Sequence, residues 1–139
     1  MDHSSILERL KTQGFRLTAA RKQLVELFGK ECHPVSAADV LAMLKKHGLN
    51  VNTTTAYREL TFLEEQGIIR SVHFQDGVQR YESADLPHHH HAICVSCHRV
   101  EDIEMEHNFS AVERQIKKQK NFAVSHHSLE FYGRCGRCG

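Results

Sequence analysis

Apolar residues recur at helical spacing in four segments of the first half of the chain, each ending near a glycine. Thr18 and Ser36 stand directly before the second and third segments, where a side-chain oxygen can cap a helix N-terminus. Asp39 would place an acid in the first turn of the third helix. We therefore expect four helices, in segments 4–15, 19–30, 37–50 and 52–68.

Two β-type runs follow these helices, at residues 68–74 and 78–83. The Asp76-Gly77 pair between them is typical of a tight hairpin turn. Helices followed by a hairpin are the element order of a winged helix. Residues 83–88 are polar and contain Pro87, which favours a linker after the hairpin.

The second half of the chain has a different pattern. Short β-type runs lie within residues 91–103 and 122–133, and an amphipathic helix is expected between them at 109–121. The sequence thus predicts an α+β protein with one domain at 1–84 and a smaller one at 85–139.

Composition bears on the partners, leaving only a local charged patch possible, and changes the meaning of the cysteines. The 18 Lys and Arg residues nearly balance the 17 Asp and Glu residues, so no global basic field indicates a nucleic acid or membrane. We see neither a run long enough to span a membrane nor a signal peptide, and we expect a cytoplasmic protein. In that reducing compartment, thiols more often bind metal than form disulfides.

Most of the metal-ligating side chains lie in the second domain, which holds eight of the 12 histidines and four of the five cysteines. These cysteines form two CxxC motifs separated by 37 residues. Two such turns can complete a tetrahedral structural zinc site, and four thiolates leave no open position for catalysis. The alternatives are a redox dithiol or two unrelated thiol pairs. The proposed zinc ligands are Cys94, Cys97, Cys135 and Cys138.

Four consecutive histidines precede the first CxxC motif. If they enter a strand, His89 and His91 point to one face and His88 and His90 to the other, which allows two metal sites. Asp102 would fall roughly opposite His89 or His91 across the hairpin. Mixed imidazole and carboxylate ligands suit Fe(II), Mn(II), Co(II) or Zn(II). The alternatives are a solvated polar loop or an engineered tag.

Five motifs together resemble the ferric uptake regulator family of bacterial metalloregulators. They are "GFRLTAAR" at 14–21, "HPVSAADV" at 33–40, "TTAYRELTFLEEQGI" at 54–68, "HHHHAICVSC" at 88–97 and "SHHSLEFYGRCGRC" at 125–138. The resemblance implies an N-terminal winged-helix DNA-binding domain followed by a small α/β dimerisation domain with a four-cysteine zinc site. It also implies a homodimer that binds an AT-rich palindromic operator in double-stranded DNA.

The same resemblance implies ligand sets and DNA contacts, residue by residue. The regulatory site at the domain junction would use His33, Glu82, His89, His91 and Asp102. A second site would use His88, His90 and His127, with Glu104, Glu106, His107 or Glu113 in place of the family's acid. Tyr57 would lie against bases, and backbone contacts would come from Arg16, Thr18, Arg21, Thr55 and Arg58.

The signal is the remaining question, and Glu82 bears on it. Zinc sensors of the family usually carry Cys at this position and peroxide sensors usually carry Asp. We therefore expect iron-responsive repression, with Fe(II) or Mn(II) at the regulatory site and Zn(II) as a separate structural ion. Alternatives are a peroxide sensor, in which iron at the regulatory site reacts with peroxide and a ligating His is oxidised, and a thiol-based redox switch. No nucleophile or acid/base pair accompanies the histidines, so we do not expect an enzyme.

Overall fold

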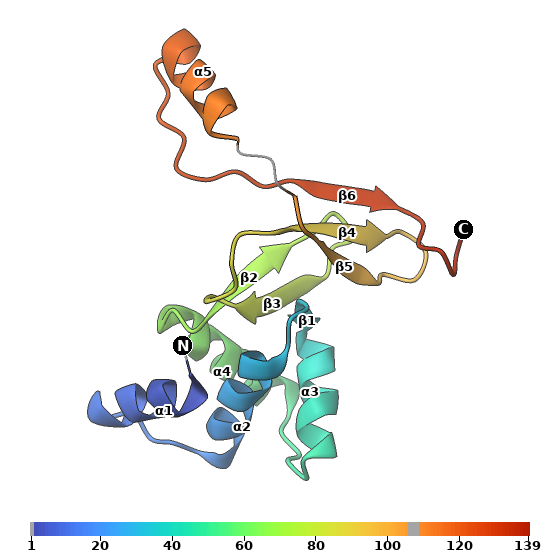
Figure 1. Cartoon of the computed structure of the whole chain (residues 1–139). Coiled ribbons are helices and arrows are strands. Elements are labelled where there is room, and N and C mark those ends of the chain that lie inside the picture. Colours follow the sequence, from blue (N-terminus) through green and yellow to red (C-terminus); the bar gives the residue numbers. More distant parts are fainter. Residues whose placement is uncertain (1, 106–108) are drawn as a thin grey trace. The chain divides into compact units, whose positions relative to one another are not determined.

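The computed structural model describes residues 2–105 and 109–139 and divides into two compact units, Met1–Pro87 and His88–Gly139 (Figure 1). The boundary lies three residues beyond the one expected from the sequence. Among the described residues, no helix is both long and apolar enough to cross a membrane.

The first unit contains the four helices and the hairpin in the predicted order (Figure 1). Its helices are α1 (His3–Thr12), α2 (Ala19–Lys30), α3 (Ala37–Lys46) and α4 (Thr53–Glu65). Its strands are β1 (Val35–Ser36), β2 (Ile69–His73) and β3 (Gln79–Ser83), which form an antiparallel sheet in the order β1-β3-β2. The sequence did not predict β1, because a two-residue strand has no detectable periodicity.

The helix starts follow from local side-chain chemistry. The Thr18 hydroxyl accepts a hydrogen bond from the Arg21 backbone N–H at 3.2 Å. Ser36 and Asp39 form a reciprocal capping box at the start of α3. These two caps confirm the prediction. Gly14 adopts a positive φ of 87° just after α1, a conformation that glycine tolerates without strain.

One apolar core holds the first unit together. It draws leucines from all four helices, including Leu10, Leu24, Leu44 and Leu60, each fully buried. The same helix that buries Leu60 turns Tyr57 outward, where 45% of that residue is exposed. A rigid helical core therefore positions an exposed polar face on α4.

The second unit is built on a three-stranded sheet (Figure 1). Its elements are β4 (His90–Cys94), β5 (Val100–Ile103), α5 (Ser110–Lys120) and β6 (Glu130–Gly133). Strand β4 lies in the middle, antiparallel to β5 and parallel to β6. The helix was predicted within one residue at each end.

The last predicted strand is shorter than expected, and it does not contain His126 or His127. Its pairing with β4 begins at Glu130, which lies opposite His91. Because β4 itself starts at His90, only one residue before this pairing begins, the sheet has no strand beside His127. His127 is thus in an irregular segment, so strand alternation does not determine the direction of its side chain.

The second unit has little apolar core of its own. Among its described residues, Ile93 and Cys94 are the only buried side chains counted as hydrophobic, and α5 buries none. Units of this size rarely stay folded on so small a core without a disulfide, a metal or a partner. Its stability must come from such a source.

Candidate metal centres and DNA-binding surface

The sheet brings the two CxxC motifs together. Cys94 ends β4, and it pairs in register with Gly133 at the end of the parallel strand β6. The turn after each strand therefore lies at the same edge of the sheet. The four sulfur atoms of Cys94, Cys97, Cys135 and Cys138 all lie within 4.8 Å of one another. All five cysteines of the chain carry free thiols.

Backbone groups around the cluster favour thiolates. The Cys94 sulfur accepts hydrogen bonds from the backbone N–H of Cys135 at 3.4 Å and of Cys97 at 3.5 Å. These bonds, with that of Cys135 the stronger, lower the pKa of Cys94 to about 6. The Cys135 pKa is also lowered, mainly by the backbone N–H of Arg137. The Cys94 thiolate thus stabilises the metal-free fold above the unfolded-state pKa, and this contribution is lost as pH falls through about 6.

Cys138 behaves in the opposite way. Its thiol donates to neighbouring sulfurs, above all that of Cys135, which raises its pKa to about 12. Four negative sulfurs cannot share so small a volume without a cation among them. The cluster therefore holds at least one proton when metal-free and suits a divalent ion that replaces it.

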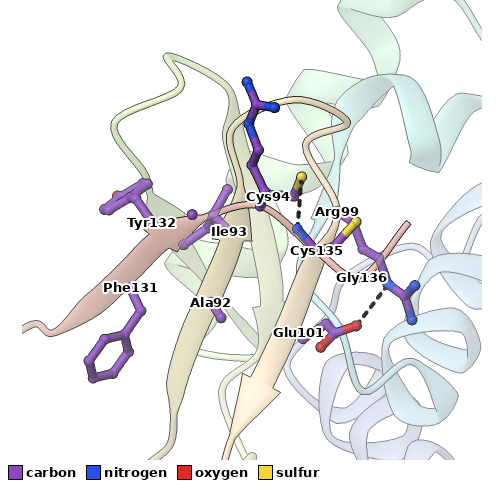
Figure 2. A pocket seen from close by; sticks show the side chains of 11 residues that line it. Ala92, Ile93, Cys94, Arg99, Glu101, Phe131, Tyr132, Cys135 and Gly136 are labelled. Atoms are coloured by element: carbon purple, nitrogen blue, oxygen red, sulfur yellow. Dashed lines mark hydrogen bonds and ion pairs between the residues drawn. The ribbon is translucent and has the colours of Figure 1, made fainter. Parts of the chain in front are cut away.

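A hollow of about 360 Å³ lies beside the cysteine cluster (Figure 2). Figure 2 shows the Cys135 backbone nitrogen turned toward the Cys94 sulfur and the Arg99 guanidinium paired with Glu101 at 3.0 Å. Ile93 and Phe131 also line the hollow. Residues of β4, β5 and β6 line the hollow, and Cys94 and Cys135 of the cluster are among the lining residues.

One face of the histidine run forms the first imidazole cluster. The rings of His89 and His91 have centroids 4.6 Å apart. Their Nε2 atoms lie 3.8 Å and 3.7 Å from the same Asp102 oxygen. Asp102 pairs in register with His91 across the hairpin, as the alternation argument predicted. Two imidazoles and a carboxylate thus converge on one point in the second unit.

The other two residues of the expected regulatory set belong to the first unit. His33 is exposed two residues before β1, and its backbone N–H donates to Glu31. Glu82 lies in β3, the strand that pairs with β1. Its carboxylate accepts a hydrogen bond from Nε of Arg70 at 2.8 Å. The sequence interpretation overlooked Arg70, although Arg70 and Glu82 each lie six residues from Asp76 in the turn.

The opposite face of the histidine run forms the second imidazole cluster. His88, His90 and His127 each place a ring nitrogen within 4.8 Å of the others. Nδ1 of His127 lies 3.5 Å from Glu113, which α5 supplies. Among the described residues, Nε2 of His127 is buried without a hydrogen-bond partner. A bound cation would satisfy such an atom.

Of the two candidates for the acid position that the structure describes, Glu104 and Glu113, one lies at this cluster. Glu113 lies one turn into α5, next to His127, whereas Glu104 is exposed after β5. Glu106 and His107 lie outside the described residues. Phe109 packs beside His127 with ring centroids 4.8 Å apart. The arrangement favours Glu113 as the carboxylate of a mixed site.

Helix α4 presents the side chains expected to meet DNA. Tyr57 and Arg58 are both exposed, and together with Thr54 and Thr61 they line a shallow hollow on this helix. The Thr55 backbone N–H is held by the Asn52 cap at 2.8 Å. Arg16 is exposed in the loop before α2. The geometry presents an aromatic ring and a cation side by side on one helix.

Two side chains expected to contact the DNA backbone, those of Arg21 and Thr18, have partners within the protein. Arg21 forms a two-pronged ion pair with Glu59, at 2.9 and 3.0 Å, and its guanidinium lies 3.7 Å from the Phe62 ring centroid. The Thr18 hydroxyl is engaged as the helix cap. Arg21 therefore fastens α2 to α4, and no sequence signal joins residues 38 positions apart.

Comparison with known proteins places these sites in context. The sequence model of the ferric uptake regulator family matches residues 12–132. The ferric uptake regulation protein of Neisseria gonorrhoeae is 33% identical over 141 residues, covering 99% of this chain and 96% of that protein. The Helicobacter pylori ferric uptake regulator shares the fold, with a TM-score of 0.83 at 22% identity over 99% of this chain and 94% of that one. The Francisella tularensis regulator, solved with iron, has a TM-score of 0.78 at 30% identity, covering 90% and 95%.

Proposed function

The chain belongs to the ferric uptake regulator family, and on that premise we propose that it is an iron-responsive transcriptional repressor. It is a metal-dependent regulator with a DNA-binding fold. In our proposal it acts in the cytoplasm as a homodimer, binds an AT-rich palindromic operator, and has no catalytic activity. Exposed apolar side chains of the second unit, including Val112, Phe122 and Phe131, support pairing of two copies.

The observation that carries the proposal is the separation of three donor sets in one small unit. Four thiols gather at one edge of the sheet, and the four consecutive histidines divide between two clusters. Thiolates hold Zn(II) tightly, whereas imidazoles with a carboxylate accept Fe(II) or Mn(II) and release it more readily. A permanent ion and an exchangeable one are what a metal-responsive regulator needs.

We assign the exchangeable ion to His89, His91 and Asp102, joined by His33 and Glu82. The first three converge within the second unit, and the last two lie in the DNA-binding unit. An ion held by ligands from both units would restrict their relative orientation. Metal binding then favours the DNA-binding arrangement only to the extent that this arrangement binds the ion more tightly.

DNA recognition falls to α4 in this proposal. Tyr57 contacts bases, while Arg58 and Arg16 contact phosphates together with Thr55 near the helix N-terminus. Arg21 and Thr18 act by positioning, since their side chains already hold α2 and α4. The Francisella tularensis relative solved with iron supports iron as the signal.

An anaerobic metal titration tests the proposal. The zinc-loaded protein is titrated with Fe(II), Mn(II) or additional Zn(II), and its affinity for an AT-rich palindromic duplex is measured by fluorescence anisotropy. Fe(II) and Mn(II) should each tighten DNA binding by about 5- to 150-fold, the usual range of such coupling. A peroxide pulse on the Fe(II) form should leave affinity largely unchanged.

The contrary outcomes point to the alternatives. Loss of DNA binding after peroxide in the Fe(II) form but not the Mn(II) form, with an oxidised histidine found by mass spectrometry, would identify a peroxide sensor. If chelation of the exchangeable metal leaves DNA binding intact while thiol oxidation abolishes it, the metal-responsive proposal fails.

The second imidazole cluster leads to a separate prediction. Glu113→Gln should weaken Co(II) binding at this site at least about tenfold, because the ion loses a charged ligand next to His127. Co(II) absorption bands report the ligand set directly. Glu104→Gln is the matched control, since it removes the same charge from an exposed carboxylate. Weaker binding in the control but not in Glu113→Gln would contradict the assignment.

A further inference from the structure

In the first unit, the Arg70 side chain is hydrogen-bonded to the Glu82 carboxylate, which the regulatory ion would use as a ligand. Arg70 and Glu82 are directly opposed in the β2–β3 hairpin. Nε of Arg70 lies 2.8 Å from Oε1 of Glu82, a charge-assisted hydrogen bond of good length. The Glu82 side chain is 3% exposed, whereas that of Arg70 is 43% exposed. The pair joins a buried carboxylate to a cation that reaches it from the surface.

We propose that Arg70 is a built-in competitor of the regulatory metal ion, holding Glu82 in the metal-free protein and leaving it when a divalent cation binds. This inference rests on the proposed ligand role of Glu82. Metal–carboxylate bonds are about 2 Å long. A guanidinium 2.8 Å from the same oxygen would therefore lie within roughly 5 Å of a doubly charged ion, where like charges repel strongly.

The hairpin permits both states. Strand β2 is at the edge of its sheet, in the order β1-β3-β2, so the Arg70 side chain borders solvent. A long, half-exposed arginine can turn into water without disturbing the core. Glu82 has no such freedom, because β3 is the central strand and the side chain is buried. The carboxylate stays in place while one cation replaces another.

Two consequences follow for metal affinity. First, Arg70 compensates the charge of Glu82 before metal arrives, which stabilises the metal-free state. Second, its positive charge opposes the incoming ion. Both effects weaken metal binding, so Arg70 raises the free-metal concentration at which the protein responds. Because Arg70 is partly exposed, solvent screens the pair, and we expect an effect of about three- to tenfold.

The test measures Mn(II) affinity of the full-length, zinc-loaded protein by anaerobic isothermal titration calorimetry. Glu82→Gln should remove or weaken one binding step and so identify the step that belongs to this site. Arg70→Gln should tighten that same step about three- to tenfold relative to the wild type, and the gain should shrink as salt is raised. Melting of the metal-free Arg70→Gln protein should begin at a lower temperature than that of the wild type.

The matched control is Arg99→Gln. Arg99 is 44% exposed and pairs with Glu101 at 3.0 Å, so the substitution removes an equivalent charge and ion pair elsewhere. Its Mn(II) affinity should stay within about twofold of the wild type, given the weakness of exposed pairs. An equal gain in both variants would reveal a general charge effect and overturn the proposal.

Other outcomes separate this inference from the function beneath it. If Glu82→Gln weakens Mn(II) binding but Arg70→Gln leaves it unchanged or weaker, Arg70 is not a competitor and the proposed function stands. If Glu82→Gln binds Mn(II) like the wild type, the ligand assignment itself fails. Should Arg70→Gln not fold, Arg70→Met decides, because it keeps a long side chain without the charge: tighter binding than the wild type supports the proposal, and equal or weaker binding overturns it.

Discussion

Replacing Cys94 with serine is expected to abolish the cooperative folding of the second unit and, with it, dimerisation. The unit spans residues 88–139, and only Ile93 and Cys94 are buried hydrophobic side chains among its described residues. A unit of this size has a stability on the order of 3–8 kcal/mol. Structural zinc in small domains contributes about 10–16 kcal/mol of apparent binding free energy. Losing a large part of this contribution would exceed the free energy of unfolding of the unit.

Three measurements follow this effect. Zinc content per chain should fall, the thermal transition of the second unit should disappear, and size-exclusion chromatography should show monomer or aggregate. Cys32→Ser is the matched control, because Cys32 is exposed and lies outside the four-cysteine cluster. A Cys94→Ser protein that keeps its zinc, its melting temperature and its dimer would remove the structural-zinc assignment.

Replacing His89 with alanine is expected to eliminate the response of DNA binding to metal while leaving both units folded. His89 lies beside His91 and shares the Asp102 oxygen with it, so its loss removes one of two adjacent imidazoles. The Mn(II)-dependent gain in DNA affinity, about 5- to 150-fold in the wild type by our proposal, should fall to near onefold. DNA affinity without metal should not change.

The measurement is DNA-binding anisotropy with and without Mn(II), accompanied by circular dichroism. His126→Ala provides the control, because His126 is exposed and its Nδ1 is hydrogen-bonded to the hydroxyl of the neighbouring Ser125. Its metal response should equal that of the wild type. A full Mn(II) response in His89→Ala would show that the regulatory ion uses other ligands.

Local features of the fold were predictable because their physical causes lie within a few residues. The Ser36–Asp39 capping box joins residues three positions apart, and so does the Thr18 cap. The alternation of His88 to His91 is also local, since successive strand side chains point to opposite faces. The pairing of Asp102 with His91 then follows from the short hairpin.

The remaining features depend on which elements become neighbours. The parallel pairing of β4 with β6 brings the two CxxC motifs together across 37 intervening residues. The contact of His127 with Glu113 depends on how α5 and an irregular segment meet, which no periodicity encodes. The predicted length of β6 was too great for the same reason: its pairing with β4 sets where the strand begins.

The sequence alone determined the order of the elements other than β1, the caps of α2 and α3, the three candidate donor sets and the division of the histidines by strand face. Only the tertiary structure decided which charges are already engaged. Arg21 is held by Glu59, and Arg70 is held against Glu82. Motifs record which side chains a site could use, but electrostatic competition depends on distances of a few ångströms between residues far apart in the chain, and packing sets those distances.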